Sequence, residues 1–320
     1  MIERNMMGMR AVALPCLMLA ALLAFSAAAS AAGPEDFAES YIVWGIDKSG
    51  NNTSQWIGGN GPNYKVLVIR TGAFLAADNA LWEVAQDRVP MKLCEECDPA
   101  QGKCTKYGTG QNEFDIELAL RRLGSDQKIV LIDWATGSDL LVGYHRDITL
   151  LGLIGPYLFV MHQDYQMTCG AAHGNMSAEF FVWDLGAKSK AVLYSGPEIR
   201  AVRAKDQVRA FQRLKANDWE GRAASELEFT AIHPQWSKQS LELGYQFTGE
   251  ACYACSDGLW ESYSRSEIVD AHSIPKKLQP FAEPPAAISA FMRDHPEVTI
   301  RGFSTVDPGH KTDLFGLFNK

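Results

Sequence analysis

The sequence lacks most of the short motifs by which enzymes are commonly identified. It contains no G-x-S-x-G, no H-E-x-x-H and no G-x-x-x-x-G-K-[ST], and its glycines do not form G-x-G-x-x-G. The stretch from Asp47 starts like a calcium-binding loop, but its twelfth position is Gly58 where that loop needs a glutamate. These absences favour a non-enzymatic role, and we expect neither a cofactor nor a metal.

Long apolar runs are also missing after residue 31, so no membrane-spanning helix is predicted there. The first 31 residues have the pattern of an export signal. Arg4 and Arg10 precede an apolar run at 11–25, and a small-residue stretch ends in Ala29-Ser30-Ala31. We expect residues 1–31 to be a signal peptide that is removed, which predicts a soluble periplasmic or extracellular protein.

Basic residues are outnumbered, since 30 Lys and Arg face 38 Asp and Glu, for a formal net charge of −8. An acidic surface repels phosphate, so we expect no nucleic-acid partner, while a ligand or protein partner stays unknown. Residues 199–215 are the exception, because they carry six cations and only one acid, Asp206. This basic stretch could dock an acidic partner or lipid headgroups, or form an ordinary solvated helix face.

Cysteine is sparse but its number is informative. Of seven cysteines, Cys16 falls inside the expected signal peptide, and an even number remains in the mature chain: Cys94, Cys97, Cys104, Cys169, Cys252 and Cys255. In an exported protein this predicts three disulfides, which allow 15 pairings. Two alternatives follow from the pairs Cys94–Cys97 and Cys252–Cys255, each spaced C-x-x-C. Together they could bind zinc through four thiolates, or Cys252 and Cys255 could act as a thiol-disulfide oxidoreductase.

Short alternating or β-branched segments separated by Gly-containing turns dominate the chain up to residue 195. The clearest are residues 157–161 and 180–185, and residues 114–123 are expected to pair with residues 128–134. This spacing predicts a mainly β fold of antiparallel sheets, either a sandwich or a propeller-like arrangement. A two-domain α+β fold is the alternative. The cysteine-rich residues 91–112 are expected to form a loop that depends on disulfides.

Helical signals are confined to the C-terminal third. In residues 199–219, Ala204, Val208, Phe211 and Leu214 recur at helical spacing and form one apolar stripe. Residues 285–294 predict a short helix begun by proline. We expect a mainly β domain at 32–196, followed by an α+β or continuing β region at 197–320.

One polar segment collects side chains that could carry chemistry. His162, Asp164, Cys169 and His173 follow the apolar residues 157–161, and we expect them to share a loop. Such residues could bind a transition metal, or form a Cys–His nucleophile pair. The leading hypothesis is nonetheless a binding or interaction module, because loops on a rigid sheet suit that role. The second is a hydrolase that uses loop carboxylates with His162 or His173.

Overall fold

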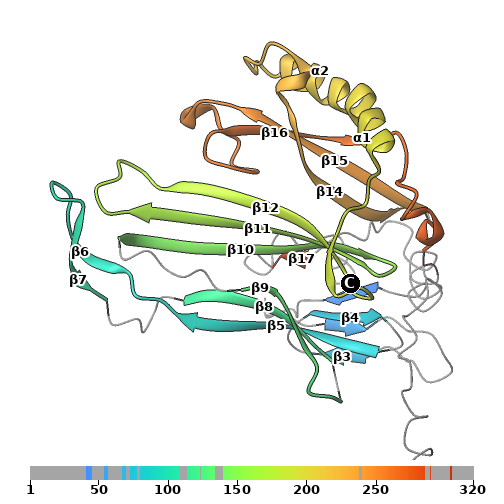
Figure 1. The fold of residues 1–320 in the computed structure, drawn as a ribbon, viewed down its shortest axis with the longest axis horizontal. Helices are drawn as coiled ribbons and strands as arrows, with labels where there is room; N and C mark the ends of the chain where they lie inside the picture. Colours follow the sequence, from blue (N-terminus) through green and yellow to red (C-terminus); the bar gives the residue numbers. More distant parts are fainter. Residues whose placement is uncertain are drawn as a thin grey trace, which may run out of the picture. The chain divides into compact units, whose positions relative to one another are not determined.

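The fold is known from a computed structural model of the chain (Figure 1). It describes residues 41–44, 54–56, 67–69, 73–77, 80–108, 114–122, 124–133, 140–237, 240–284, 289 and 303–304. All of them belong to one unit, Ala32–Lys320. Within these residues, no helix combines the length and the hydrophobicity needed to cross a bilayer.

Antiparallel sheets make up most of the described structure. The first has five strands in the order β1-β4-β5-β8-β9: β1 (Tyr41–Trp44), β4 (Ala73–Ala77), β5 (Ala80–Pro90), β8 (Phe114–Arg122) and β9 (Lys128–Ile132). The second has the order β13-β12-β11-β10-β17: β13 (Ser189–Ala191), β12 (Asn175–Asp184), β11 (Tyr157–Thr168), β10 (Leu141–Ile154) and β17 (Phe303–Ser304).

A three-stranded sheet follows in the chain: β14 (Glu228–Ser237), β15 (Ser240–Glu250) and β16 (Ser264–Asp270). Two short antiparallel pairs complete the strands: β2 (Ser54–Trp56) with β3 (Leu67–Ile69), and β6 (Cys94–Asp98) with β7 (Lys103–Tyr107). The helical segment between the second and third sheets runs through α1 (Gly196–Val202), the π-helical turn η2 (Arg203–Gln207) and α2 (Val208–Ala216). Three-residue 3₁₀ turns are η3 (Ala224–Glu226), η4 (Tyr253–Cys255) and η5 (Gln279–Phe281).

The hydrophobic core joins the sheets and the helix. Leu118 and Leu120 of β8, Leu158 and Phe159 of β11 and Tyr245 of β15 are all fully buried within one cluster. Burial of that many large side chains is the main source of stability, because each contributes about 1.5–3 kcal/mol when it leaves water.

The longest hairpin, β10–β11, turns at Gly155 and Pro156. Gly155 has a φ of 55°, in the left-handed region. A Cβ at Gly155 would also lie 2.5 Å from the Phe281 ring. Glycine is therefore required there both by the turn and by the packing of η5 on it.

The helical segment begins at a capping box. The Ser195 hydroxyl accepts from the backbone of Glu198, and the Glu198 carboxylate accepts from the backbone N–H of Ser195. The Ser195 hydroxyl also donates to the Glu198 carboxylate at 2.6 Å, and this bond, followed by those from the backbone N–H groups of Lys276 and Ser195, lowers the pKa of Glu198 to about 2. At the other end the helix stops at Ala216, with Asn217 as its C-cap.

The prediction of a mainly β, antiparallel fold is confirmed, and the helical segment Gly196–Ala216 lies in the C-terminal half of the chain. Residues 114–122 form β8 and pair with β9, as expected, while the last residue of the predicted strand lies outside the described residues. The cysteine-rich residues 91–112 were wrongly expected to be a loop, since β6 and β7 form a hairpin there. A disulfide across the hairpin supplies the stability that its composition lacks. The expected signal peptide and most of the expected helix at 285–294 lie outside the described residues, and the boundary near residue 196 stays a prediction.

Candidate functional site

The six cysteines expected in the mature chain form three disulfides, as predicted. Cys94 pairs with Cys104 across the β6–β7 hairpin, and Cys97 pairs with Cys169 at the end of β11. Cys252 pairs with Cys255 around η4. The four-thiolate zinc alternative is therefore wrong, because oxidised sulfurs are not thiolate ligands. Cys252 caps only a 3₁₀ turn, so the α-helix dipole that lowers a thiol pKa in C-x-x-C oxidoreductases is missing from this pair.

His162 and Asp164 do not share a loop with His173, contrary to expectation. Both belong to β11, which continues seven residues beyond the apolar stretch to Thr168 because β10 pairs with it to that residue and β12 pairs with it as far as Gln166. Residues two apart in a strand share a face, and His162 Nδ1 lies 3.7 Å from Asp164. His173 lies in the next turn and contacts Tyr253 and Tyr263 instead.

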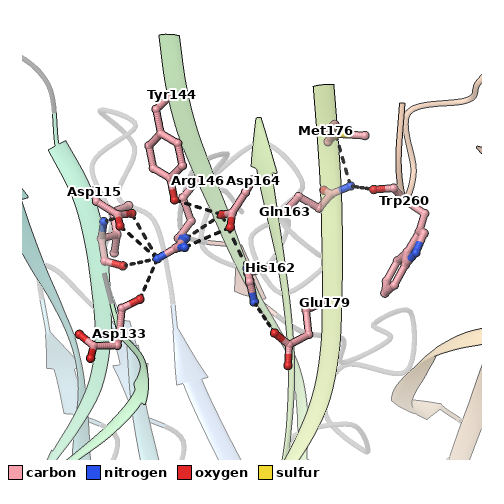
Figure 2. A network of polar contacts seen from close by, with 11 residues as sticks. Asp115, Asp133, Tyr144, Arg146, His162, Gln163, Asp164, Met176, Glu179 and Trp260 are labelled. Atoms are coloured by element: carbon pink, nitrogen blue, oxygen red, sulfur yellow. Dashed lines mark hydrogen bonds and ion pairs between the residues drawn. The ribbon is translucent and has the colours of Figure 1, made fainter. Parts of the chain in front are cut away.

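Asp164 belongs to a polar network that crosses between the two five-stranded sheets (Figure 2). Arg146 of β10 donates through Nε and Nη2 to the two carboxylate oxygens of Asp164, at 2.7 and 3.1 Å. Its Nη1 lies 3.2 Å from the carboxylate of Asp115 on β8, and donates to the carbonyls of Ile116 and Asp133. Asp115 is fully buried and Arg146 nearly so, so this is an ion pair inside the protein.

Toward the surface, the network continues from His162 to Glu179 and Lys190. His162 Nε2 lies 3.3 Å from Glu179, whose other carboxylate oxygen accepts from Lys190. Glu179 and Lys190 are half exposed, so their pairing contributes little. We interpret the network as structural, because Arg146 uses its guanidinium donors within the protein.

We expect this network to make the protein sensitive to acid. Burial raises the pKa of Asp164, but His162 and Arg146 outweigh that effect and hold the pKa well below its usual range. A carboxylate whose pKa is lower in the folded protein than in the unfolded chain stabilises the folded state. This stabilisation is complete at pH values above the pKa of the unfolded chain, about 3.9, and it is lost as the pH falls through the pKa of the folded protein. Urea unfolding of Asp164→Asn between pH 2 and 6 should show a smaller loss of stability on acidification than the unchanged protein shows.

Asp126→Asn is the matched control for that experiment, since Asp126 lies on an exposed turn after β8. Its profile should run parallel to that of the unchanged protein. If the free energy of unfolding falls equally steeply with pH for Asp164→Asn and for the unchanged protein, Asp164 is not the source of the acid sensitivity.

A cavity of about 610 Å³ lies at one end of the three-stranded sheet. Its walls combine aromatic rings with carboxylates. The aromatic side chains are Trp219, Trp260 and Tyr263. The carboxylates are Glu220, Glu226, Glu228, Glu250 and Glu261. The segment after α2, the turn η3, β14, β15 and the loop before β16 all contribute.

Trp219 forms a wall of the cavity because two glycines make room for it. A Cβ at Gly221 would lie 1.9 Å from its ring, and a Cβ at Gly249 would lie 2.2 Å from it. The indole N–H donates to the carbonyl of Glu250 at 2.9 Å, which fixes the orientation of the ring. The cavity wall is therefore preorganised by packing.

Trp260 is positioned by the second sheet. Gln163 of β11 donates to the carbonyl of Leu259 at 3.1 Å. It also contacts the carbonyl of Trp260 at 3.5 Å (Figure 2). Ser262 and Met176 of β12 exchange two further hydrogen bonds. The loop is thus held at both ends on a rigid sheet, an arrangement that suits a binding loop.

The five cavity glutamates have no ion pair with Lys, Arg or His within the described part of the chain. Among the described residues, their carboxylates accept one hydrogen bond, from the backbone N–H of Arg222 to Glu226 at 2.9 Å. Several like charges around one cavity repel each other, and a bound cation would relieve that repulsion.

An exposed aromatic cluster adjoins the cavity through Tyr263. His173 stacks on Tyr253 with 4.0 Å between ring centroids, and its Nε2 lies 3.0 Å from the Tyr263 hydroxyl. Both tyrosines are 47% exposed and Leu259 is 53% exposed. The Cys252–Cys255 disulfide constrains the turn that carries Tyr253. A ligand in the cavity could therefore extend onto apolar surface.

No family model, curated protein or solved structure matches this chain. The site must consequently be judged on its own geometry. Sequence reasoning missed the cavity glutamates, although one signal was available: Trp219 and Trp260 are each followed directly by glutamate. Nothing in the sequence indicated that these two Trp-Glu pairs meet in space.

Proposed function

We propose that this protein is an exported binding protein whose ligand carries a positively charged group into the glutamate-lined cavity. The observation that carries the proposal is the cavity itself, in which five carboxylates that form no ion pair with the described residues surround three aromatic rings. Tryptophan and tyrosine faces attract cations, and nearby carboxylates add Coulomb attraction. Amines, quaternary ammonium groups and the side chains of lysine or arginine have this chemistry.

Two further observations support the proposal. The three disulfides are typical of proteins that mature in an oxidising compartment, which fits export. The net charge of −8 and the acidic cavity both oppose phosphate-bearing ligands, in line with the expectation of no nucleic-acid partner. The alternative of a hydrolase that uses loop carboxylates with His162 or His173 stays a prediction, and the two rings lie in different environments, His162 beside Asp164 and His173 beside Tyr263.

The proposal predicts that small cations bind and quench tryptophan fluorescence. Spermidine, trilysine and choline are suitable probes, with triglutamate as the probe of opposite charge. We expect saturable changes with at least one cation at 10 mM salt, weakening at 150 mM as the Debye length falls from about 30 to about 8 Å. Glu228→Gln with Glu261→Gln should weaken the binding roughly fivefold per residue, since an exposed charge pair contributes up to about 1 kcal/mol.

Glu283→Gln is the matched control, because Glu283 is exposed and lies outside the cavity. It should bind the same probe as the unchanged protein does. If no cation binds at low salt, or if Glu283→Gln weakens binding as much as the cavity variants do, the proposal fails.

A further inference from the structure

A second constellation lies at the opposite end of β16 from the cavity. Asp206 of η2, His272 and Ser273 form a continuous hydrogen-bonded chain. One Asp206 carboxylate oxygen contacts His272 Nδ1, and His272 Nε2 lies 3.1 Å from the Ser273 hydroxyl. Ser264 lines the cavity and His272 lies eight residues further on, so about 25 Å of extended chain separates the two sites.

The carboxylate is held in a fixed position inside the protein. Asp206 is fully buried, although it comes from an otherwise basic helix. The π-helical turn η2 shifts the residues of this turn relative to a regular α-helix, and both Asp206 and Gln207 face the interior. Such turns are frequent at functional sites. Asp206 also accepts from Arg209 and, at 3.2 Å, from the backbone N–H of His272.

Ser273, whose hydroxyl ends this series of hydrogen bonds, is also held in place by the backbone, but it faces solvent. The Tyr245 hydroxyl donates to the carbonyl of Ser273 at 2.7 Å, and Tyr245 itself is fully buried. Just before it, the backbone N–H of Ala271 donates to Leu243 at 2.8 Å. Ser273 is exposed and His272 is partly buried. A substrate can therefore reach the Ser273 hydroxyl, while the Asp206 carboxylate is shielded from water.

The direction of each hydrogen bond follows from the chemistry of the groups. An ionised carboxylate only accepts, so the proton on His272 must be at Nδ1 when the ring is neutral. Nε2 is then the acceptor, and the Ser273 hydroxyl donates to it. This is the relation between carboxylate, imidazole and hydroxyl that activates a serine nucleophile, and it recurs on unrelated folds in any chain order.

We propose that Ser273 is a nucleophile toward carboxylic esters with a good leaving group, with His272 as its general base and Asp206 as the positioning residue. In the first step Ser273 Oγ forms a bond to the acyl carbon, and its proton passes to His272 Nε2. The alcohol leaves with that proton. Water then attacks the acyl-serine through His272, which releases the carboxylic acid and returns the proton to Ser273. The step needs no oxidant and no cofactor.

The test uses p-nitrophenyl acetate and a fluorophosphonate probe on the full chain. We expect the unchanged protein to hydrolyse the ester above the buffer rate and to be labelled on Ser273, as located by peptide mass spectrometry. Ser273→Ala should abolish labelling and lower kcat/KM about 100-fold. Ser225→Ala is the matched control, because Ser225 is an exposed serine in η3 and belongs to no such chain; both its rate and its labelling should be unchanged.

His272→Gln and Asp206→Asn test the other two roles. His272→Gln should lose activity as fully as Ser273→Ala does. Asp206→Asn turns an acceptor into an amide, which disturbs the tautomer of His272, so kcat should fall while KM stays within about twofold. Circular dichroism on each variant identifies any that fails to fold, in which case Ser273→Ala, at an exposed position, decides the question. Absence of labelling in the unchanged protein, or labelling that survives Ser273→Ala, overturns the proposal.

Discussion

Replacing Arg146 by methionine is expected to lower the free energy of unfolding by about 3 to 5 kcal/mol, the usual cost of breaking a buried ion pair from one side. The change removes the cation that lies 3.2 Å from Asp115 and 2.7 Å from Asp164. Asp115 is fully buried, so water cannot replace the lost charge without opening the protein. Urea unfolding at pH 7, followed by circular dichroism, measures the effect.

Arg222→Met is the matched control, since Arg222 is exposed and belongs to no ion pair within the described residues. It should change stability by less than about 0.5 kcal/mol. The triple variant Asp115→Asn, Arg146→Met and Asp164→Asn removes all three charges together and should recover part of the loss. If Arg146→Met lowers the free energy of unfolding no more than Arg222→Met does, the ion pair of Arg146 with Asp115 and Asp164 is not buried as described above.

The second large effect is expected from the Cys97–Cys169 disulfide. Replacing both cysteines by alanine should destabilise the protein by about 4 kcal/mol, because the bond closes a loop across 72 residues and so restricts the unfolded chain strongly. The bond also fastens the β6–β7 hairpin to the turn after β11, so the hairpin should lose protection from hydrogen exchange. Thermal unfolding without reductant, together with hydrogen exchange of the hairpin, measures both effects.

The Cys252–Cys255 disulfide provides the internal comparison. It spans only three residues, and its replacement by alanine should cost about 2 kcal/mol. The Cys94–Cys104 disulfide spans ten residues and should give an intermediate value of about 3 kcal/mol. Equal losses for all three pairs would contradict the argument from loop length and would indicate that local packing dominates.

Local patterns in the sequence predicted several elements of the fold correctly. The alternation in residues 114–123 indicated β8, and the apolar stripe of Ala204, Val208, Phe211 and Leu214 indicated the helix. The number of cysteines indicated three disulfides. These features depend on residues that are close in the chain or on the number of cysteines. They can therefore be predicted without knowledge of the tertiary structure.

The polar segment around His162 shows where such reasoning failed. The polar residues were interpreted as a loop, but β11 continues through His162 and Asp164 because β10 and β12 both pair with it at these positions. A strand with polar side chains stays a strand when those side chains find partners, as Asp164 does with Arg146 on the neighbouring strand β10, which in turn pairs with Asp115 of the other sheet. The partners are distant in the chain, so the local pattern did not reveal them.

The sequence by itself determined the mainly β class, the helix that follows the second sheet and the oxidation of its cysteines, since periodicity and composition act over short distances. Only the tertiary structure decided which cysteines pair, that five glutamates and two tryptophans surround one cavity, and that Asp206 meets His272. Asp206 and His272 are 66 residues apart, and contacts over such separations depend on how the sheets and the helix pack. Packing is a property of the whole core, and no single stretch of residues encodes it.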